Sequence, residues 1–155
     1  MASDICPCGS GEKYRLCCRP FHRGEKEPPT VDKLVRARFC AYALKEIDFL
    51  WKTLSPEHAD KKSGDELEVK RVLRRGANAL NFVRLQLLDV DQREPGELSR
   101  VLFVAEIFEK GKDHSLIEAS NFTHDGTGWR YLSGVTRELK GMKDVGALRL
   151  DTFKL

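Results

Sequence analysis

Four cysteines crowd into the first 18 residues and offer the side chains that hold a metal ion. They form two pairs separated by eight residues, Cys6 with Cys8 and Cys17 with Cys18. The sulfurs of a tetrahedral zinc site lie about 3.8 Å apart, which two pairs can reach if the chain reverses between them. Four protein ligands leave no position open for water or substrate. The pattern therefore predicts one structural Zn²⁺ ion rather than a catalytic one.

The residues around the first pair favour such a reversal. Gly9 and Gly11 permit a positive φ, and Pro7 fixes its own φ. Cys6 and Cys8 would point to opposite faces of a regular strand. We therefore expect the backbone to bend between them.

Three other uses of clustered cysteines fit this spacing less well. A disulfide between Cys17 and Cys18 would close a strained small ring. A thiol redox pair more often has the spacing Cys-x-x-Cys, which is absent, and the common iron–sulfur motifs are spaced differently. The fifth cysteine, Cys40, lies alone in a helical pattern and is expected to be a small buried hydrophobic residue.

Composition excludes several classes of protein. The 155 residues fit one ordinary domain with a small appendage, and 41% of them are hydrophobic, as in globular proteins. No apolar run is long enough to span a bilayer and no secretory signal is visible, so we expect a cytoplasmic protein. The net charge is +3 with the basic residues scattered, and four zinc-bound thiolates would bring it close to neutral. Nucleic-acid binding is therefore not favoured.

The chain divides into three segments by composition. Residues 1–24 form the cysteine- and glycine-rich head. Residues 25–30 are charged, contain two prolines and lack apolar anchors, which is typical of a linker. Residues 31–155 carry the pattern of a folded domain, with Thr30 as the expected cap of its first helix.

Within the third segment, helical periodicity comes first and strand alternation follows. Helices are expected over 31–45, 48–54 and 65–75, the last stopped by Gly76, with a loop at 58–64. Strands are expected near 80–90, 99–109, 114–123 and 129–135, and Ala147 to Leu155 could add one more. Helices followed by an antiparallel meander predict an α+β fold, with helices packed on one face of a curved sheet.

The head reads Cys-Pro-Cys-Gly-Ser-Gly-x-Lys-Tyr-x-x-Cys-Cys from Cys6 to Cys18. This pattern resembles the SEC-C motif, the zinc-binding segment also found at the C-terminus of the SecA translocation motor, and Ser10, Lys13 and Tyr14 agree as well as the cysteines. In SecA the segment contacts a chaperone, the ribosome and lipid surfaces. By analogy, the resemblance implies docking of a protein or ribosomal partner through the head.

Further matching segments lie at residues 34–42, Lys52-Thr53 with Pro56, 104–108, 111–122 and 128–131. Through them the remainder resembles the YchJ-like family, which joins a SEC-C motif to an NTF2-like domain. The resemblance implies a cone-shaped NTF2-like (cystatin-like) fold, which often encloses a pocket and commonly forms a homodimer through its sheet. Some members carry a second SEC-C motif, but no cysteine follows Cys40 in this sequence.

A pocket in the cone would be lined by a few polar and aromatic side chains. The candidate liners are Arg38, Trp51, Glu118, Ser120 and Trp129, and the candidate acid–base groups are Glu106, Glu118, His58, His114 and His124. The three histidines lie in or beside predicted turns, where exposure to solvent explains them. Glu118 interrupts an apolar strand, and we expect it to pair with Arg38.

The register of one hairpin decides whether two of these acids could act together. If the turn at Gly111-Lys112 has an even length, residue 105 lies opposite residue 118, and Glu106 and Glu118 point to opposite faces. An odd turn would place both carboxylates on one face.

Three functions remain open from the sequence, and the least favoured is binding of RNA or the ribosome through the basic residues near Arg15 and Arg19. The leading hypothesis is a non-enzymatic adaptor that docks a protein or the ribosome through its zinc head. The alternative is an NTF2-like domain that binds or converts a small molecule, with the head serving stability or recruitment. A deep cone with converging polar groups would favour the alternative, whereas a cone plugged by aromatic side chains would favour the adaptor.

Overall fold

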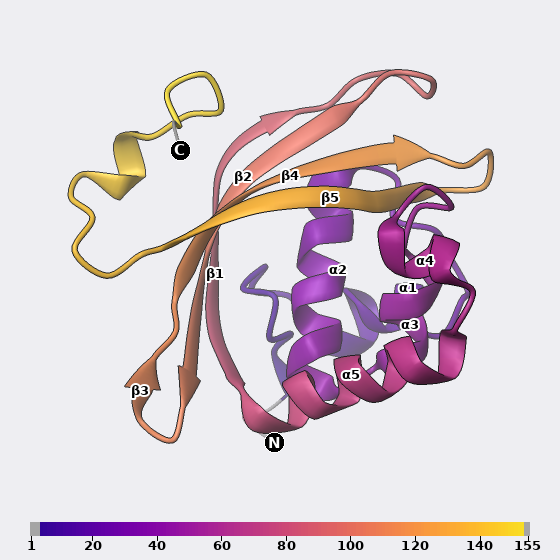
Figure 1. The fold of residues 1–155 in the computed structure, drawn as a ribbon, viewed down its shortest axis with the longest axis horizontal. Coiled ribbons are helices and arrows are strands. Elements are labelled where there is room, and N and C mark those ends of the chain that lie inside the picture. Colours follow the sequence, from indigo (N-terminus) through magenta and orange to yellow (C-terminus); the bar gives the residue numbers. More distant parts are fainter. Residues whose placement is uncertain (1–3, 154–155) are drawn as a thin grey trace.

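The computed structural model describes residues 4–153, in which helices come first and an antiparallel sheet follows (Figure 1). The helices are α1 (Arg19–His22), α2 (Val31–Leu44), α3 (Ile47–Lys52), α4 (Ala59–Ser63) and α5 (Glu66–Ala79). The strands are β1 (Asn81–Asp91), β2 (Ser99–Glu109), β3 (Lys112–Asp113), β4 (Leu116–His124) and β5 (Trp129–Glu138). Short 3₁₀ turns span Tyr14–Leu16 and Val145–Ala147.

The strands form one antiparallel sheet in the order β1-β2-β4-β5, with the short β3 paired to β2. The sheet curves around α2, and α3, α4 and α5 close one side of the resulting cone (Figure 1). The predicted α+β class, with helices packed on one face of a curved antiparallel sheet, is confirmed.

Alternation along the strands gives the sheet two apolar faces. On β2, Phe103, Ala105 and Ile107 belong to the main core beneath α2. Leu102 and Val104, one residue out of step, belong to a second cluster on the opposite face. This period of two is what a sheet covered on both sides requires.

The second apolar face is covered by the chain after β5. In Figure 1 this segment lies across the sheet from α2. Its apolar side chains pack on the sheet's outer face: Leu139, Met142, Val145, Leu148, Leu150 and Phe153. The strand that the sequence suggested over 147–155 is not formed within the described residues up to 153; Lys154 and Leu155 lie outside them.

Two helix predictions were wrong for identifiable reasons. The expected loop at 58–64 contains α4, which His58 caps through Nδ1, an acceptor for the Asp60 N–H, and which Gly64 ends in the left-handed conformation. Helix α5 runs through Gly76 to Ala79. Ala77 is buried there, so packing outweighs the low helix propensity of one glycine.

The first helix of the domain begins where the sequence predicted, but with a different cap. Thr30 occupies the N-cap position without a side-chain capping bond, and its buried hydroxyl has no partner among the described residues. The Val31 N–H donates instead to the Gln92 side chain, 2.8 Å away. A residue distant in sequence therefore satisfies the helix start.

Within residues 4–153, no helix combines the length and apolar character needed to cross a membrane.

Candidate metal centre and cone cavity

The first cysteine pair lies on a tight hairpin-like loop. Ile5 and Lys13 form an isolated antiparallel bridge, and the Cys6 N–H donates to the Glu12 carbonyl at 2.8 Å. Gly9 and Gly11, which lie between Cys6 and Glu12, turn the chain with φ of +83° and +85°. Both values lie in the region that glycine adopts without steric cost. The bend expected between Cys6 and Cys8 follows from this loop.

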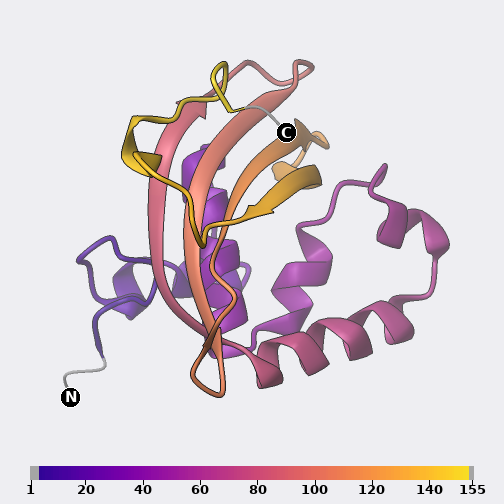
Figure 2. The same cartoon turned by 60° about the vertical axis from the view of Figure 1, so that its left-hand side comes forward.

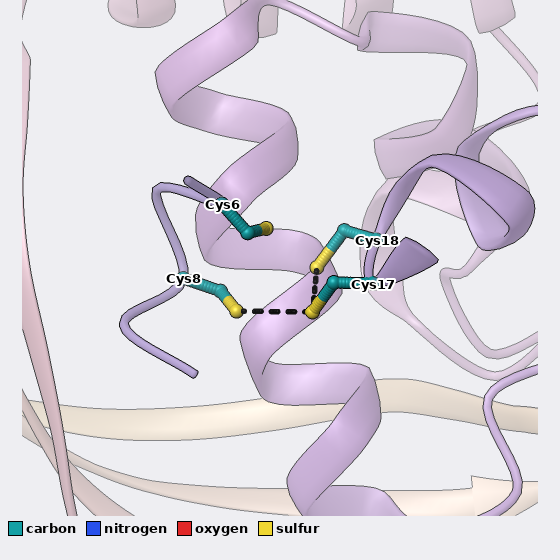
Figure 3. Close-up of side chains that lie close together, drawn as sticks. All are labelled: Cys6, Cys8, Cys17 and Cys18. Carbon is teal, nitrogen blue, oxygen red and sulfur yellow. Dashed lines mark hydrogen bonds between the residues drawn. The ribbon is translucent and has the colours of Figure 1, made fainter. Parts of the chain in front are cut away.

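The second pair follows a 3₁₀ turn and begins a helix. The Cys17 N–H donates to the Tyr14 carbonyl at 3.0 Å, and Cys18 is the N-cap of α1. Because the backbone changes direction at this junction, both thiols turn toward the first pair (Figure 3).

The four thiols converge to the dimensions of a metal site. Their sulfurs all lie within 4.8 Å of one another. The Sγ atoms of Cys8 and Cys17 are 3.5 Å apart, and those of Cys17 and Cys18 are 3.9 Å apart. A tetrahedral zinc site needs sulfurs about 3.8 Å apart. The donor set thus fits one thiolate-bound metal ion.

Hydrogen bonds and burial shift the pKa values of three of the four thiols. The pKa of Cys6 is held below its usual range by hydrogen bonds from neighbouring thiols, first among them Cys18. Hydrogen bonding to Cys40 and Cys6, together with burial, raises the pKa of Cys18. Desolvation raises the pKa of Cys17 to about 11. Four thiolates this close together would repel one another, and a bound cation offsets that repulsion.

Donors around the cluster support the ligand-bearing loops. The Ser10 hydroxyl lies 3.1 Å from the Cys17 sulfur. Arg36 on α2 donates to the Cys8 carbonyl at 2.8 Å, which ties the loop to the body of the protein.

Cys40 is buried in the apolar core, as the sequence predicted, but it is not isolated from the other cysteines. It is fully buried on α2, but its sulfur lies 3.7 Å from that of Cys6. Cys40 is outside the group of four thiols that lie mutually close, but it interacts with two of them, Cys6 and Cys18. Sequence spacing carries no signal for this contact, because Cys40 is brought there by the packing of α2.

His22 joins the head to α2 and was missed by sequence reasoning. Its Nδ1 is 2.8 Å from the Tyr14 hydroxyl, and its Nε2 is 2.8 Å from the Ala37 carbonyl. The ring also packs on Phe49. Burial lowers the pKa of His22, so the neutral ring bridges the two segments.

The segment 25–30 is held against the body rather than free. Arg130, almost fully buried, pairs with Glu27 at 2.8 Å and with Asp125 at 2.8 Å. Lys52 adds a second ion pair to Glu27 at 3.3 Å. The head also shares the main apolar core, which includes three of its cysteines. Figure 2 shows the head beside α2 and β1.

The head borders a broad, open hollow of about 680 Å³. Leu16 and Phe21 supply apolar surface there, and Leu16 is 64% exposed. The hollow is lined by as many acidic as basic side chains, Glu12, Glu27 and Asp32 against Lys26, Lys33 and Arg36.

The cone encloses a cavity of about 230 Å³ between α2 and the concave face of the sheet. Arg38, Glu118 and Ser120, three of the proposed liners, border it, together with Tyr131. The walls are otherwise mainly apolar, and they include six aromatic rings: Phe39, Tyr42, Phe82, Phe103, Phe122 and Tyr131. The cone is therefore neither plugged nor purely apolar.

Hydrogen bonds fix the polar side of the cavity. Glu118 accepts from the Ser120 hydroxyl at 2.5 Å and from the Tyr131 hydroxyl at 3.0 Å, both on Oε2. Arg38 donates through Nη1 to the Leu50 carbonyl and to the Thr53 hydroxyl. The expected pairing of Arg38 with Glu118 is not made among the described residues, because each has other partners.

The remaining candidates lie away from the cavity. Trp51 packs under the Lys61 ammonium, 4.3 Å from its ring centre, and Trp129 is buried against His124. His114 is exposed beside Glu109. His58 caps α4, although its ring lies 5.6 Å from that of Tyr131.

Glu106 and Glu118 do not form a pair of catalytic acids. Phe103 lies opposite Glu118, so residue 106 points to the other face of the sheet, where it meets Arg84. The register is displaced by two residues from the one considered in the sequence analysis. A shift of two preserves the face of every side chain.

Comparisons with known proteins agree with this architecture. Residues 30–134 match the family model described as YchJ, middle NTF2-like domain, and residues 3–20 match the SEC-C motif. The chain is also similar to a SEC-C motif containing protein from Rhodopseudomonas palustris, whose solution structure is known. The identity is 28% and the TM-score 0.70, over 84% of this chain and 96% of the other.

A second solved structure has the same fold. It is the crystal structure of a SEC-C motif containing protein from Psychrobacter arcticus, with 19% identity and a TM-score of 0.69. The similarity covers 86% of this chain and 84% of that one.

Proposed function

Since the chain belongs to the family with the YchJ middle NTF2-like domain and carries a SEC-C motif, we propose that it is a non-enzymatic adaptor that docks a protein or ribosomal partner through a zinc-bound head. Cys6, Cys8, Cys17 and Cys18 would hold one Zn²⁺ ion. With four protein ligands the ion is structural, and it keeps the loops of the head in place.

One observation supports the docking role: the head presents apolar surface to solvent. Leu16 is 64% exposed between the 3₁₀ turn and the second cysteine pair, beside the hollow that Phe21 also lines. Its backbone is fixed by the neighbouring ligands, so a partner would meet a preformed surface. Thiolate ligands also favour a reducing compartment, which supports a cytoplasmic location.

The docking role is tested with two matched leucine variants. Leu16→Glu places a charge on the head. Leu67→Glu is the matched control, because it makes the same substitution at an exposed leucine of α5, outside the head, where Leu67 is 84% exposed. Cosedimentation with purified ribosomes and quantitative capture from lysate are compared for wild type and both variants. We expect Leu16→Glu alone to lose the partners. Equal recovery by Leu16→Glu and wild type would contradict docking through this surface.

A second candidate function, small-molecule binding or chemistry in the cone, is favoured by the cavity itself. Apolar pockets with a few converging polar groups are the usual form of ligand sites. Glu118 and Arg38 converge on such a pocket here. In this alternative the zinc head would stabilise the protein or recruit it to a partner.

A further inference from the structure

We propose that the cone cavity binds a small, mainly apolar molecule whose neutral head both donates and accepts hydrogen bonds, such as an aromatic amide. This inference rests on the second candidate function, a ligand in the cone, and adds the chemical class of that ligand.

One carboxylate oxygen of Glu118 could accept a hydrogen bond from a ligand. Both hydroxyl donors, from Ser120 and Tyr131, bond to Oε2. Within residues 4–153, Oε1 has no hydrogen-bond partner. Because a carboxylate can only accept when ionised, a ligand that meets Oε1 must donate.

Two nitrogens of the Arg38 guanidinium could donate hydrogen bonds to a ligand in the same cavity. Its Nη1 is occupied by Leu50 and Thr53, at 3.0 and 2.6 Å. Nε and Nη2 make no hydrogen bond to the described part of the chain. The group lies over the Tyr131 ring, 4.9 Å from its centre. A ligand that meets these nitrogens must accept, since arginine has no acceptor.

The two charges together select against a charged ligand. A cation bound at Glu118 would also approach Arg38, and an anion bound at Arg38 would approach Glu118. Away from bulk water such repulsions are weakly screened. A neutral group that donates to the carboxylate and accepts from the guanidinium satisfies both side chains without this repulsion.

The volume of the cavity limits the size of the ligand, and its apolar walls favour an apolar ring. A dry apolar cavity of about 150 Å³ already takes up benzene. The cone's 230 Å³ therefore has room for one ring and a short polar substituent. Aromatic rings such as Phe82, Phe103 and Phe122 line the walls and would pack on the ligand's ring.

Glycine at position 134 keeps the polar side open. Gly134 lies opposite Ser120 in the sheet, and a Cβ there would collide with Glu118 Oε2 and approach the Tyr131 hydroxyl to 2.6 Å. The missing side chain thus leaves room for the hydrogen bonds that orient Glu118.

Four probes with the same ring test the proposal: benzamide, benzoate, benzylamine and toluene. Each is titrated into zinc-loaded, ¹⁵N-labelled full-length protein, and amide shifts are followed at Phe103, Ser120 and Tyr131. We expect benzamide to bind about tenfold more tightly than the other three, since each of those lacks or mismatches a hydrogen bond to a charged group. Shifts should centre on the cavity and not on the cysteine loops.

The outcomes separate this inference from the function on which it rests. Toluene binding as tightly as benzamide, or tightest binding of a charged probe, would overturn the ligand class and leave a ligand-binding cone. Absence of any cavity shift would overturn both.

A pair of isosteric variants tests the role assigned to Glu118. Glu118→Gln should weaken benzamide binding about tenfold, because it removes the charged acceptor while it keeps size and shape. Glu106→Gln, on the opposite face of the same sheet, should leave the affinity unchanged. Equal benzamide affinity of wild type and Glu118→Gln would overturn the proposal.

Discussion

The head and the cone both gather functional side chains, but they differ in what those side chains leave unsatisfied. In the head, four thiols converge within 4.8 Å of one another and together match the donor set of a complete metal coordination shell. In the cone, Glu118 and Arg38 each keep hydrogen-bonding capacity beside a cavity of about 230 Å³. A completed shell stabilises a fold, whereas spare capacity in a cavity is what a ligand can use.

Removing the metal should break the head most severely. The double variant Cys17→Ser with Cys18→Ser is expected to lower bound zinc from about one ion per chain to about zero, because two of the four ligands are lost. Elemental analysis of purified protein measures this. Cys40→Ala is the matched control, since it removes a buried thiol next to Cys6 that is not one of the four. Full zinc content in the double variant would contradict the ligand assignment.

The second-largest effect is expected from breaking the ion pairs of Arg130, which hold segment 25–30 against the body of the protein. Arg130→Met should destabilise the protein by about 3 kcal/mol, because Glu27 and Asp125 lose their buried partner. Removing one partner of a buried ion pair costs about 3–5 kcal/mol, and we expect the lower value because both acids are partly exposed. Urea unfolding of the zinc-loaded protein measures it. A change below about 1 kcal/mol would show that solvent satisfies both carboxylates without Arg130.

Two glycines give opposite outcomes for the same substitution in the cone. Gly134→Ala should destabilise by about 1 kcal/mol, since its methyl group would push the flexible end of the Glu118 side chain away from its hydrogen bonds to Ser120 and Tyr131. Gly76→Ala should stabilise α5 by roughly 0.5–1 kcal/mol, because a Cβ there meets no atom within 4 Å and alanine favours helix. Thermal unfolding of both variants distinguishes them. Similar effects at the two positions would refute the crowding at Gly134.

The smallest expected effect is a pH dependence at the junction of head and α2. Burial lowers the pKa of His22 from its ordinary 6.5, so the unfolded chain takes up a proton before the folded one does. The stability that neutral His22 contributes is therefore complete above pH 6.5 and is lost as the pH falls below that value toward the folded pKa.

The variant His22→Gln should flatten this dependence. Unfolding free energies of both proteins are compared between roughly pH 7.5 and 5.5, the range of histidine titration. The wild type should lose more stability on acidification than the variant. Parallel curves would show that His22 does not titrate in this way.

What could be predicted from the sequence depends on how local each feature is. The four cysteines stand within a single short loop and turn, so their spacing was enough to bring them together. The opposite faces of Glu106 and Glu118 followed from strand alternation, which survived a register shift of two residues. The strands themselves were found because alternation and turn residues are local signals.

The features that the sequence missed depend on packing between distant segments. Cys40 reaches Cys6, and Arg130 reaches Glu27, across separations that no spacing rule covers. Trp51 and Trp129 do not line the cavity, because the Trp51 ring packs under Lys61 of α4 and the Trp129 ring packs against His124 at the end of β4. Helix α4 was missed because its five polar residues carry no apolar periodicity.

Helix α2 forms a wall of both sites, and this has a thermodynamic consequence. Arg36, Ala37 and Cys40 contact the head, while Val35, Arg38 and Phe39 line the cavity. A shift of this helix caused by occupancy of one site would change the geometry of the other. Linkage then requires reciprocity: the factor by which zinc alters the affinity for a cone ligand equals the factor by which that ligand alters the affinity for zinc.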